Sequence, residues 1–464
     1  MQVSVTRLLP SDEGCPPAKG VQRRPAQRAW AKRKNSRRAL PLKHLTCFLL
    51  ASLLVFSILQ EPLTALEPSP EDRELLEKIE KDTLHYFIRF SDKKTGLTRD
   101  SSRPGAPSSI AATGFALAAY ALGASRGWIP QDDAYQHILK TLKFLKREAA
   151  HEEGFFYHFL DPKTGNRAWA SEASSIDTAL LIAGALLTAQ YYPGTEVERL
   201  TQEIYDRVNW KWMMHGSDFI CMGWKPESGF LPYYWDAYNE LMFLQALAIG
   251  SATHPIPPKA WDRWLRPQGE YNGHRIVYCY NGSLFTYQFS HAFIDFRNLD
   301  DNGINYFQNS REATLANRDY SLSLAEKHKG YSENSWGLSA SVGPGGYRAY
   351  GGKPGEGTQD GTIAPYAALS SIVFTPEEST KAARFFYESY EKNLYGEFGF
   401  KDAFNLDKNW WAKEYLGIDQ GITLLMLENY LQDEIVWKKF MELPAIQKWI
   451  ELTGLNKRSI QTQN

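Results

Sequence analysis

Acidic side chains next to aromatic rings are the residues of this sequence best suited to chemistry. Asp236 and Glu240 are four residues apart and directly follow the ring-rich segment 230–235. In a helix over residues 237–250, this spacing would place both carboxylates on one face. Two carboxyl groups, one protonated and one ionised, are what cleavage of a glycosidic bond requires. A structural interpretation stays open, in which Asp236 caps the helix and Glu240 complements its dipole.

Glu240 is the candidate general acid. An apolar helix beneath aromatic rings would desolvate its carboxyl group and raise its pKa, so that the group keeps a proton near neutral pH. The candidate base is Asp402 or Asp360, which come from other loops and would act through a water molecule, with inversion at the sugar carbon. The sequence does not decide between these two. Each acid could instead be a helix cap, an ion-pair partner or an acceptor for a substrate hydroxyl.

Further acids, rings and basic side chains are candidates for binding the substrate. Aromatic rings stack on the apolar faces of sugars, acids accept hydrogen bonds from hydroxyl groups, and arginines pair with carboxylates. The candidates are Glu172, Asp177, Trp235, Asp236, Tyr287, His291, Arg297, Glu333, Trp336, Tyr347, Arg348 and Trp411. Structural roles compete with these assignments, above all for His291, which would lie in an aromatic helix, and for Asp177, which could be an N-cap.

No motif points to a metal or a cofactor. The sequence holds neither CxxC nor HExxH, and its GPGG turn at 343–346 lacks the surrounding pattern of a phosphate-binding loop. The net charge is -1, which gives no bias toward nucleic acid. We therefore expect neither metal nor cofactor, no nucleic-acid partner, and a monomer.

The elements that must position these side chains alternate between apolar and amphipathic helices. The apolar stretches are 109–122, 177–189, 237–250, 289–296, 363–372 and 419–431. Their more polar followers are 132–149, 196–212, 259–265, 304–327, 377–394 and 435–452, and an amphipathic helix over 71–90 opens the series. Inner and outer helices in alternation predict an all-α protein, an (α/α)6 barrel. Residues 275–280 are the best candidate for a strand.

Long connections lead into most of the inner helices. They cover residues 150–175, 213–235, 266–289, 328–361 and 395–418. Long loops in a compact domain are usually functional. Because each one precedes an inner helix, we expect them to gather at the barrel end where the inner helices begin, and to form a cleft there.

Residues 1–66 have the composition of a targeting segment. A basic stretch at 23–43 precedes an apolar run at 45–59 and then small residues, the order found in signal peptides. The run is short of the ~20 residues of a bilayer span, which favours a cleaved signal, although an uncleaved anchor remains an alternative. We expect an exported protein, periplasmic or secreted, with a catalytic domain over 67–456 and a disordered tail over 457–464.

Composition fits a sugar-binding enzyme without requiring one. The chain has 464 residues, of which 43% are hydrophobic and 14% aromatic, with 14 Trp and 25 Tyr. Such a chain can bury a large core, and surplus rings suit a carbohydrate cleft, although large cores also use rings. Cys221 and Cys279 would be the cysteines of a mature chain, as a disulfide or as two buried thiols.

Several segments, in order over roughly residues 70–455, resemble the glucoamylase-like domain family, which includes endo-β-1,2-glucanases of glycoside hydrolase family 144 and a domain of cyclic β-1,2-glucan synthases. Among them are YNELMFLQALAIGSATHPI, LFTYQFSHAFIDFRN, YSENSWGLSAS, GPGGYRAYG, GFKDAFN and GIDQGITLLMLENY. The resemblance implies an (α/α)6 barrel, hydrolysis of β-1,2-linked glucan with inversion, and no metal. It also implies that Glu240, in YNELM, is the acid, and that an acidic cleft contains Glu172, Asp177, Glu333, Asp360 and Asp402.

Two other functions stay open at this stage. A polysaccharide lyase on the same barrel would need a Tyr or His base and a cation for its uronate substrate, whereas these loops hold more acids than bases. A glycan-binding protein without catalysis would keep the rings but would not need Glu240.

Overall fold

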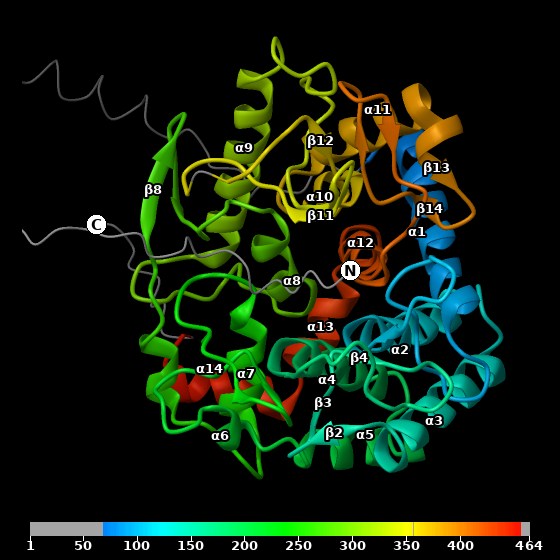
Figure 1. Ribbon diagram of the computed structural model, residues 1–464, viewed down its shortest axis with the longest axis vertical. Coiled ribbons are helices and arrows are strands. Elements are labelled where there is room, and N and C mark those ends of the chain that lie inside the picture. Colours follow the sequence, from blue (N-terminus) through cyan, green and yellow to red (C-terminus); the bar gives the residue numbers. More distant parts are fainter. Residues whose placement is uncertain (1–67, 356, 456–464) are drawn as a thin grey trace, which may run out of the picture. The chain divides into compact units, whose positions relative to one another are not determined.

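Two concentric rings of helices form the described part of this computed structural model, residues 68–355 and 357–455 (Figure 1). The inner ring contains α2 (Ile110–Ser125), α4 (Ser175–Ala189), α7 (Leu241–Gly250), α8 (Phe285–Phe293), α10 (Pro365–Leu369) and α12 (Gly417–Leu431). The outer ring contains α1 (Pro70–Phe90), α3 (Gln131–Arg147), α5 (Glu196–Asp206), α9 (Tyr306–Ser323), α11 (Pro376–Leu394) and α14 (Pro444–Thr453). The (α/α)6 barrel predicted from the sequence is confirmed.

The inner helices pack closely because their sequences consist largely of small and apolar residues. In α2, every residue from Ile110 to Ala124 is buried. Where α2 crosses α4, a Cβ atom added to Gly184 would lie 2.0 Å from the carbonyl oxygen of Gly114. The outer helices are amphipathic, and α3 and α5 bury only one face each. This difference sorts the helices into the two rings.

The ring closes differently from the order predicted from the sequence. The outer partner of α12 is α1, and the outer partner of α7 is α14. The segment 259–265 does not supply an outer helix, since only a short 3-10 helix, η1 (Pro258–Asp262), forms there. The predicted helix over 435–452 is divided before Pro444 into α13 (Ile435–Met441) and α14. The first helix and the last helices therefore complete the barrel together.

Two other predicted helices also differ in the structure. The helix predicted over 237–250 begins only at Leu241, so Asp236 and Glu240 do not share a helical face. The one predicted over 196–212 ends at Asp206, and a short helix, α6 (Trp210–Met213), follows it.

Short antiparallel strands occur in the connecting loops. The pairs are β1 (Ser108–Ser109) with β4 (Phe159–Leu160), β2 (His151–Glu152) with β3 (Phe155–Phe156), β8 (Gln268–Tyr271) with β9 (His274–Val277), β10 (Ala340–Gly343) with β11 (Gly346–Ala349), and β13 (Tyr395–Gly396) with β14 (Gly399–Phe400). Two three-stranded sheets join β5 (Ala173–Ser174), β6 (Gly223–Lys225) and β7 (Gly229–Phe230), and β12 (Thr362–Ile363), β15 (Phe404–Asn405) and β16 (Trp410–Trp411). The predicted strand at 275–280 corresponds in part to β9.

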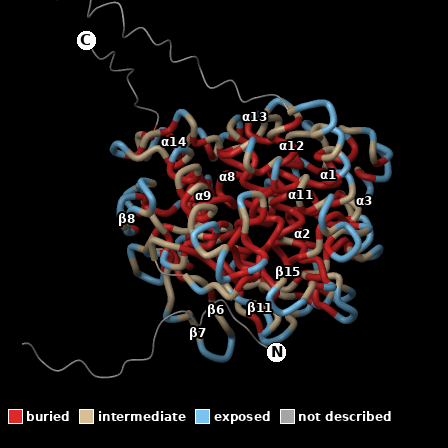
Figure 2. Tube along the Cα trace, turned by 90° about the horizontal axis from the view of Figure 1, so that it is seen from above, coloured by how far each residue is buried: buried red, intermediate tan, exposed pale blue. Residues whose placement is uncertain are grey.

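The strands gather at one end of the barrel. Figure 2 shows β6, β7, β11 and β15 at the end opposite α13 and α14. Strand β5 runs directly into α4, and β12 directly precedes α10, so the inner helices begin at this same end. The loops predicted to form a cleft therefore lie together, over the N-termini of the inner helices.

The predicted leader (1–66) and tail (457–464) lie outside the described residues. Among residues 68–355 and 357–455, no helix combines the length and the apolar character that crossing a membrane requires. Cys221 and Cys279 are separate buried thiols, so the two-thiol alternative describes the structure.

Candidate active site

Carboxyl groups from five segments act on one another at the strand-rich end of the barrel. Asp100 comes from the loop after α1, Asp177 and Asp419 from the first turns of α4 and α12, Glu240 from the residue before α7, and Asp402 from the loop between β14 and β15. Electrostatic repulsion links Asp177 to Glu240, and Asp100 to Asp177, Asp402 and Asp419. The inner helices thus bring acids that are distant in sequence into one cluster.

Glu240 is the carboxyl group of this cluster best suited to donate a proton. Burial raises its pKa to about 7, with a further contribution from the charge of Asp177, while a hydrogen bond from its own backbone amide acts in the opposite direction. The residue as a whole is nevertheless partly exposed. Its backbone is fixed, because Ser290 Oγ donates a hydrogen bond of 2.9 Å to the Glu240 carbonyl oxygen. A carboxyl group with these properties can serve as a general acid near neutral pH.

Asp402 and Asp419 form a buried carboxyl pair, and each is 2% exposed. Asp402 Oδ2 accepts a hydrogen bond of 2.6 Å from the backbone amide of Val342, and the carboxyl groups of Asp402 and Asp419 interact electrostatically. Burial raises the pKa of Asp402 to about 7 and the pKa of Asp419 well above its usual range, where the charge of Asp402 adds to the effect. Because two neighbouring buried carboxylates repel each other, the pair carries at most one negative charge at neutral pH.

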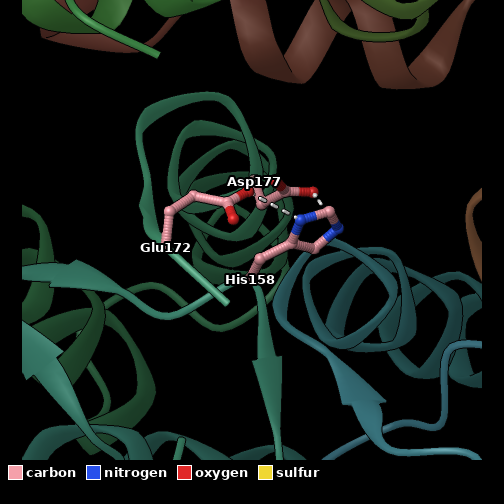
Figure 3. A group of neighbouring side chains, drawn as sticks. All are labelled: His158, Glu172 and Asp177. Atoms are coloured by element: carbon pink, nitrogen blue, oxygen red, sulfur yellow. Dashed lines mark hydrogen bonds and ion pairs between the residues drawn. The ribbon is translucent and has the colours of Figure 1, made fainter. Parts of the chain in front are cut away.

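His158 supplies the positive charge of the site. Figure 3 shows its ring beside the carboxylates of Glu172 and Asp177. Nδ1 lies 3.0 Å from Glu172 Oε1, and Nε2 lies 3.6 Å from Asp177 Oδ1. Burial alone would lower the pKa of His158, but Asp177, Glu172 and Asp100 together raise it to about 9. In turn, His158 outweighs the effect of burial on Glu172 and lowers the pKa of that carboxyl group to about 2, whereas burial of Asp177 outweighs His158 and raises the pKa of Asp177.

The same three side chains could be considered as metal ligands, since their donor atoms lie within 4.8 Å of one another. Each ring nitrogen of His158 already faces a carboxylate, however, and the imidazolium takes the place that a cation would occupy. A metal would have to displace the His158 proton first. The arrangement fits an ion-paired triad better than a metal centre.

Tyr347, on β11, lies among these acids. Burial raises the pKa of its hydroxyl group well above the usual value, and Asp419, Asp402, Asp100 and Glu240 all act in the same direction. The hydroxyl group therefore stays protonated and can donate a hydrogen bond within the acidic cluster. Of the sequence-predicted site residues, the structure thus brings together Glu240, Asp402, Glu172, Asp177 and Tyr347.

Asp360, the other candidate base, makes contacts typical of a structural residue. Its Oδ1 accepts hydrogen bonds from the Thr362 hydroxyl (2.6 Å) and the Thr362 amide (3.2 Å), and its Oδ2 lies 2.7 Å from Lys408 Nζ. Although burial opposes the shift, these partners lower the pKa of Asp360. They hold the turn that precedes β12, and they favour Asp402 over Asp360 as the base.

Four predicted binding residues have their functional atoms engaged elsewhere. Trp235 donates to Ser175 Oγ, the Tyr287 hydroxyl accepts from the Cys279 amide, His291 Nε2 shares a hydrogen bond with Ser310, and Arg297 pairs with Asp295 and Glu434. Burial also lowers the pKa of His291 to about 3, so this ring is neutral. These partners are those of residues that hold the fold together.

The remaining predicted binding residues differ in exposure. Trp336 is fully buried, whereas Glu333 is exposed and lies 3.4 Å from Arg318. Asp236 and Arg348 are also exposed. Trp411 is half-buried and stacks on Phe404 with 5.3 Å between ring centroids. No contact in the described residues joins these five to the acidic cluster.

Sequence reasoning missed Asp100, His158 and the pairing of Asp419 with Asp402. Asp100 lies in the loop 91–109, which leads from an outer helix into the inner helix α2 like the other cleft loops, so the same rule extended by one loop would have found it. His158 stands between aromatic residues in the loop 150–175, and its two carboxylate partners are visible only in three dimensions.

Known proteins share both the sequence pattern and the fold. A family model described as "Putative glucoamylase" matches residues 232–444. The crystal structure of a protein with the same description from Bacteroides uniformis is 32% identical, with 83% of this chain and 98% of that chain covered and a TM-score of 0.78. An endo-β-1,2-glucanase from Chitinophaga pinensis, solved with sophorotriose and glucose, is 27% identical, covers 82% of this chain and 98% of its own, and gives a TM-score of 0.77.

A curated relative has a related activity. It is an exo β-1,2-glucooligosaccharide sophorohydrolase (non-reducing end) of Parabacteroides distasonis, 28% identical over 420 residues. The match covers 82% of this chain but only 58% of that protein. The chain therefore spans less than two thirds of the length of this relative.

Proposed function

Because this chain belongs to the glucoamylase-like family, we propose that it is a glycoside hydrolase acting on β-1,2-linked glucan. The observation that carries the proposal is Glu240, a partly exposed residue whose carboxyl group has a pKa raised to about 7 and lies within a cluster of ionisable partners. Relatives that cleave β-1,2-linked sugars, from Chitinophaga pinensis and Parabacteroides distasonis, support the substrate class.

In the proposed mechanism, Glu240 protonates the glycosidic oxygen as the bond breaks. Asp402 accepts the proton of the attacking water, and its pairing with Asp419 leaves one acceptor charge on the two groups. This arrangement inverts the sugar carbon, because the water attacks from the face opposite the leaving group. Tyr347 donates a hydrogen bond to the substrate, and the His158 imidazolium keeps Glu172 charged and holds both Glu172 and Asp177 in place as acceptors for sugar hydroxyl groups.

For the mode of cleavage, we propose endo action. The C. pinensis relative is an endo-glucanase and the P. distasonis relative is an exo-enzyme. The reaction products must therefore distinguish endo from exo action. Linear β-1,2-glucan incubated with the enzyme should give a broad series of oligosaccharides early in the reaction. Release of a single disaccharide from the start would contradict endo action.

We also propose that the protein works outside the cytoplasm, as a monomer. The basic segment and apolar run before residue 67 support export. Cell fractionation with an antibody, and light scattering of the purified protein, test the two statements.

Glu240→Gln tests the assignment of the acid. At pH 7, we expect kcat on β-1,2-glucan to fall by ~100-fold or more while glucan still binds, since the amide cannot donate a proton to the leaving oxygen. In the unmodified enzyme, activity should fall as the pH rises past about 7, where Glu240 loses its proton, and also as the pH falls below about 7, where Asp402 gains one. Glu451→Gln, at an exposed position of α14, is the matched control.

Near-normal turnover of Glu240→Gln would show that another group is the acid. The same assay distinguishes other functions: unsaturated products from a uronate polymer would indicate a lyase, and glucan binding without any hydrolysis would indicate a binding protein.

A further inference from the structure

An exposed tryptophan stands beside the acidic cluster. Trp169 is 56% exposed, although indole rings are usually mostly buried. It lies between β4 and β5, three residues before Glu172. An exposed ring of this size contributes little to the core, so its position calls for another explanation.

The backbone that presents Trp169 is strained. Trp169 has a φ of 54° and Ala170 a φ of 49°, in the left-handed region that bulky residues rarely adopt. Each such residue costs conformational free energy. Two successive residues keep this conformation only where the surroundings enforce it, and such strain is typical of functional sites.

Arg167 enforces the conformation. Its Nη2 donates to the carbonyl oxygen of Ala170 (2.7 Å), and its Nε donates to the carbonyl oxygen of Ser171 (2.5 Å). The guanidinium group also makes two 2.8 Å hydrogen bonds to the carboxylate of Glu227, in the turn between β6 and β7. One side chain thus anchors the strained turn to a second cleft loop.

Aromatic rings connect Trp169 with the charged triad. The Trp169 and Phe159 rings are 5.0 Å apart, and Phe159 stacks on His158 with 3.9 Å between centroids and an angle of 16°. His158 in turn contacts Glu172 and Asp177. A continuous row of rings therefore leads from the acidic cluster toward solvent.

We propose that Trp169 is a stacking platform for a glucose unit remote from the cleaved bond, and that it gives the enzyme a preference for longer β-1,2-glucans. The inference rests on the proposed function, because the ring row starts at the candidate catalytic cluster. Indole faces stack on the apolar faces of pyranose rings. The clamped turn holds the ring in place before the substrate arrives, so little conformational freedom is lost on binding.

The test compares Trp169→Ala and Trp169→Phe on long β-1,2-glucan and on a β-1,2-linked trisaccharide. For Trp169→Ala, we expect KM for long glucan to rise by about 5- to 10-fold with kcat within about twofold, and kinetics on the trisaccharide to change little. Trp169→Phe should recover part of the loss. Trp128→Ala, at a half-buried tryptophan in the turn after α2, is the control, and thermal melting of each variant shows whether it is folded.

If Trp169→Ala left KM for long glucan unchanged, or raised KM equally for both substrates, Trp169 would not be a stacking platform. A separate measurement distinguishes its failure from that of the proposed function. If the unmodified protein does not hydrolyse β-1,2-glucan, calorimetric titration with the same glucan still tests the platform, because weaker binding by folded Trp169→Ala would support it and equal binding would refute it.

Discussion

At the scale of single residues, Asp402 and Asp419 are carboxyl groups in the protein interior, where burial disfavours a negative charge. Burying a carboxylate is costly unless it is neutralised or well paired. Protonation of one of the two carboxyl groups reduces the cost of burying them but does not remove it, because the pKa of Asp402 is still raised to about 7. This pair should therefore destabilise the protein at alkaline pH in a way that a functional site tolerates.

Asp402→Asn should separate stability from activity. A folded-state pKa above the unfolded value means that the native protein binds more protons between about pH 4 and 7, so wild-type stability falls as the pH rises through this range. Asparagine does not ionise, and its amide can both accept from Val342 and donate to Asp419. At pH 8 we expect the variant to melt a few °C higher than wild type, with the difference shrinking toward pH 4, and turnover to be lost.

The control for this experiment is Asp433→Asn, because the Asp433 side chain is 92% exposed. Calorimetric melting curves at several pH values give the comparison. If Asp402→Asn were less stable than wild type at pH 8, the ionised Asp402 carboxylate would stabilise the folded protein, which would contradict the prediction.

Some residues of the candidate site could be predicted from the sequence, and others could not. Glu240 was predictable because an aromatic segment and an apolar helix flank it in sequence. His158 was not, since its role depends on carboxylates that β5 and α4 bring to it. Arg297 and Trp336 were predicted as binding residues because they lie in or near cleft loops, but the loop pattern does not tell which side chains turn inward. The sequence identifies the loops; the contacts between loops need the structure.

At the scale of elements, the helix types were predictable and several boundaries were not. Apolar composition along α7 identifies an inner helix, but apolar residues continue into the turn before it, so hydrophobicity alone placed its start too early. The helix begins where the Asn239 side chain accepts a hydrogen bond of 2.9 Å from the amide of Leu241. Pro444 decided the boundary between α13 and α14, because it lies inside the predicted helix and starts a new one.

Gly184→Ala tests how tightly the inner ring is packed. The new Cβ atom would lie 2.0 Å from the Gly114 carbonyl oxygen, and backbone on both sides leaves little room to move. We expect the variant to lose about 3 kcal/mol of unfolding free energy, or not to fold. Denaturant melts measure the loss.

Gly123→Ala is the matched control in the same ring. Its Cβ atom would meet the ends of the Ile129 and Leu84 side chains at 2.8 Å, and flexible side chains can adjust. If Gly184→Ala were no less stable than Gly123→Ala, the close approach of α2 and α4 would not limit the packing.

At the scale of the whole molecule, the number of helix pairs was predictable but their partners were not. A repeating inner and outer pattern indicates the barrel, yet it does not tell that α1 covers α12 and that α14 covers α7. The short η1 leaves the outer position beside α7 vacant, and α14 fills it. The residues that decide such pairings are spread over the whole sequence.

Deleting residues 444–464 tests the closing role of α14. Its partner α7 is buried along its full length, and at their closest approach a Cβ atom on Gly250 would lie 2.1 Å from the Ala445 carbonyl oxygen. Without α14, we expect loss of cooperative unfolding and of near-ultraviolet circular dichroism, since an apolar helix would face water. Deleting 457–464 alone should leave both unchanged. Cooperative melting of the longer deletion would show that η1 and its neighbours suffice.

The position of α14 has a consequence for biosynthesis. A ribosome makes α7 well before α14, so α7 waits uncovered while the intervening helices emerge. Co-translational folding of the barrel must therefore stay incomplete until α14 is made, and the nascent chain exposes an apolar surface for that whole interval. Chaperones that hold unfinished chains act in this window, and the yield of the protein in a cell should follow their supply.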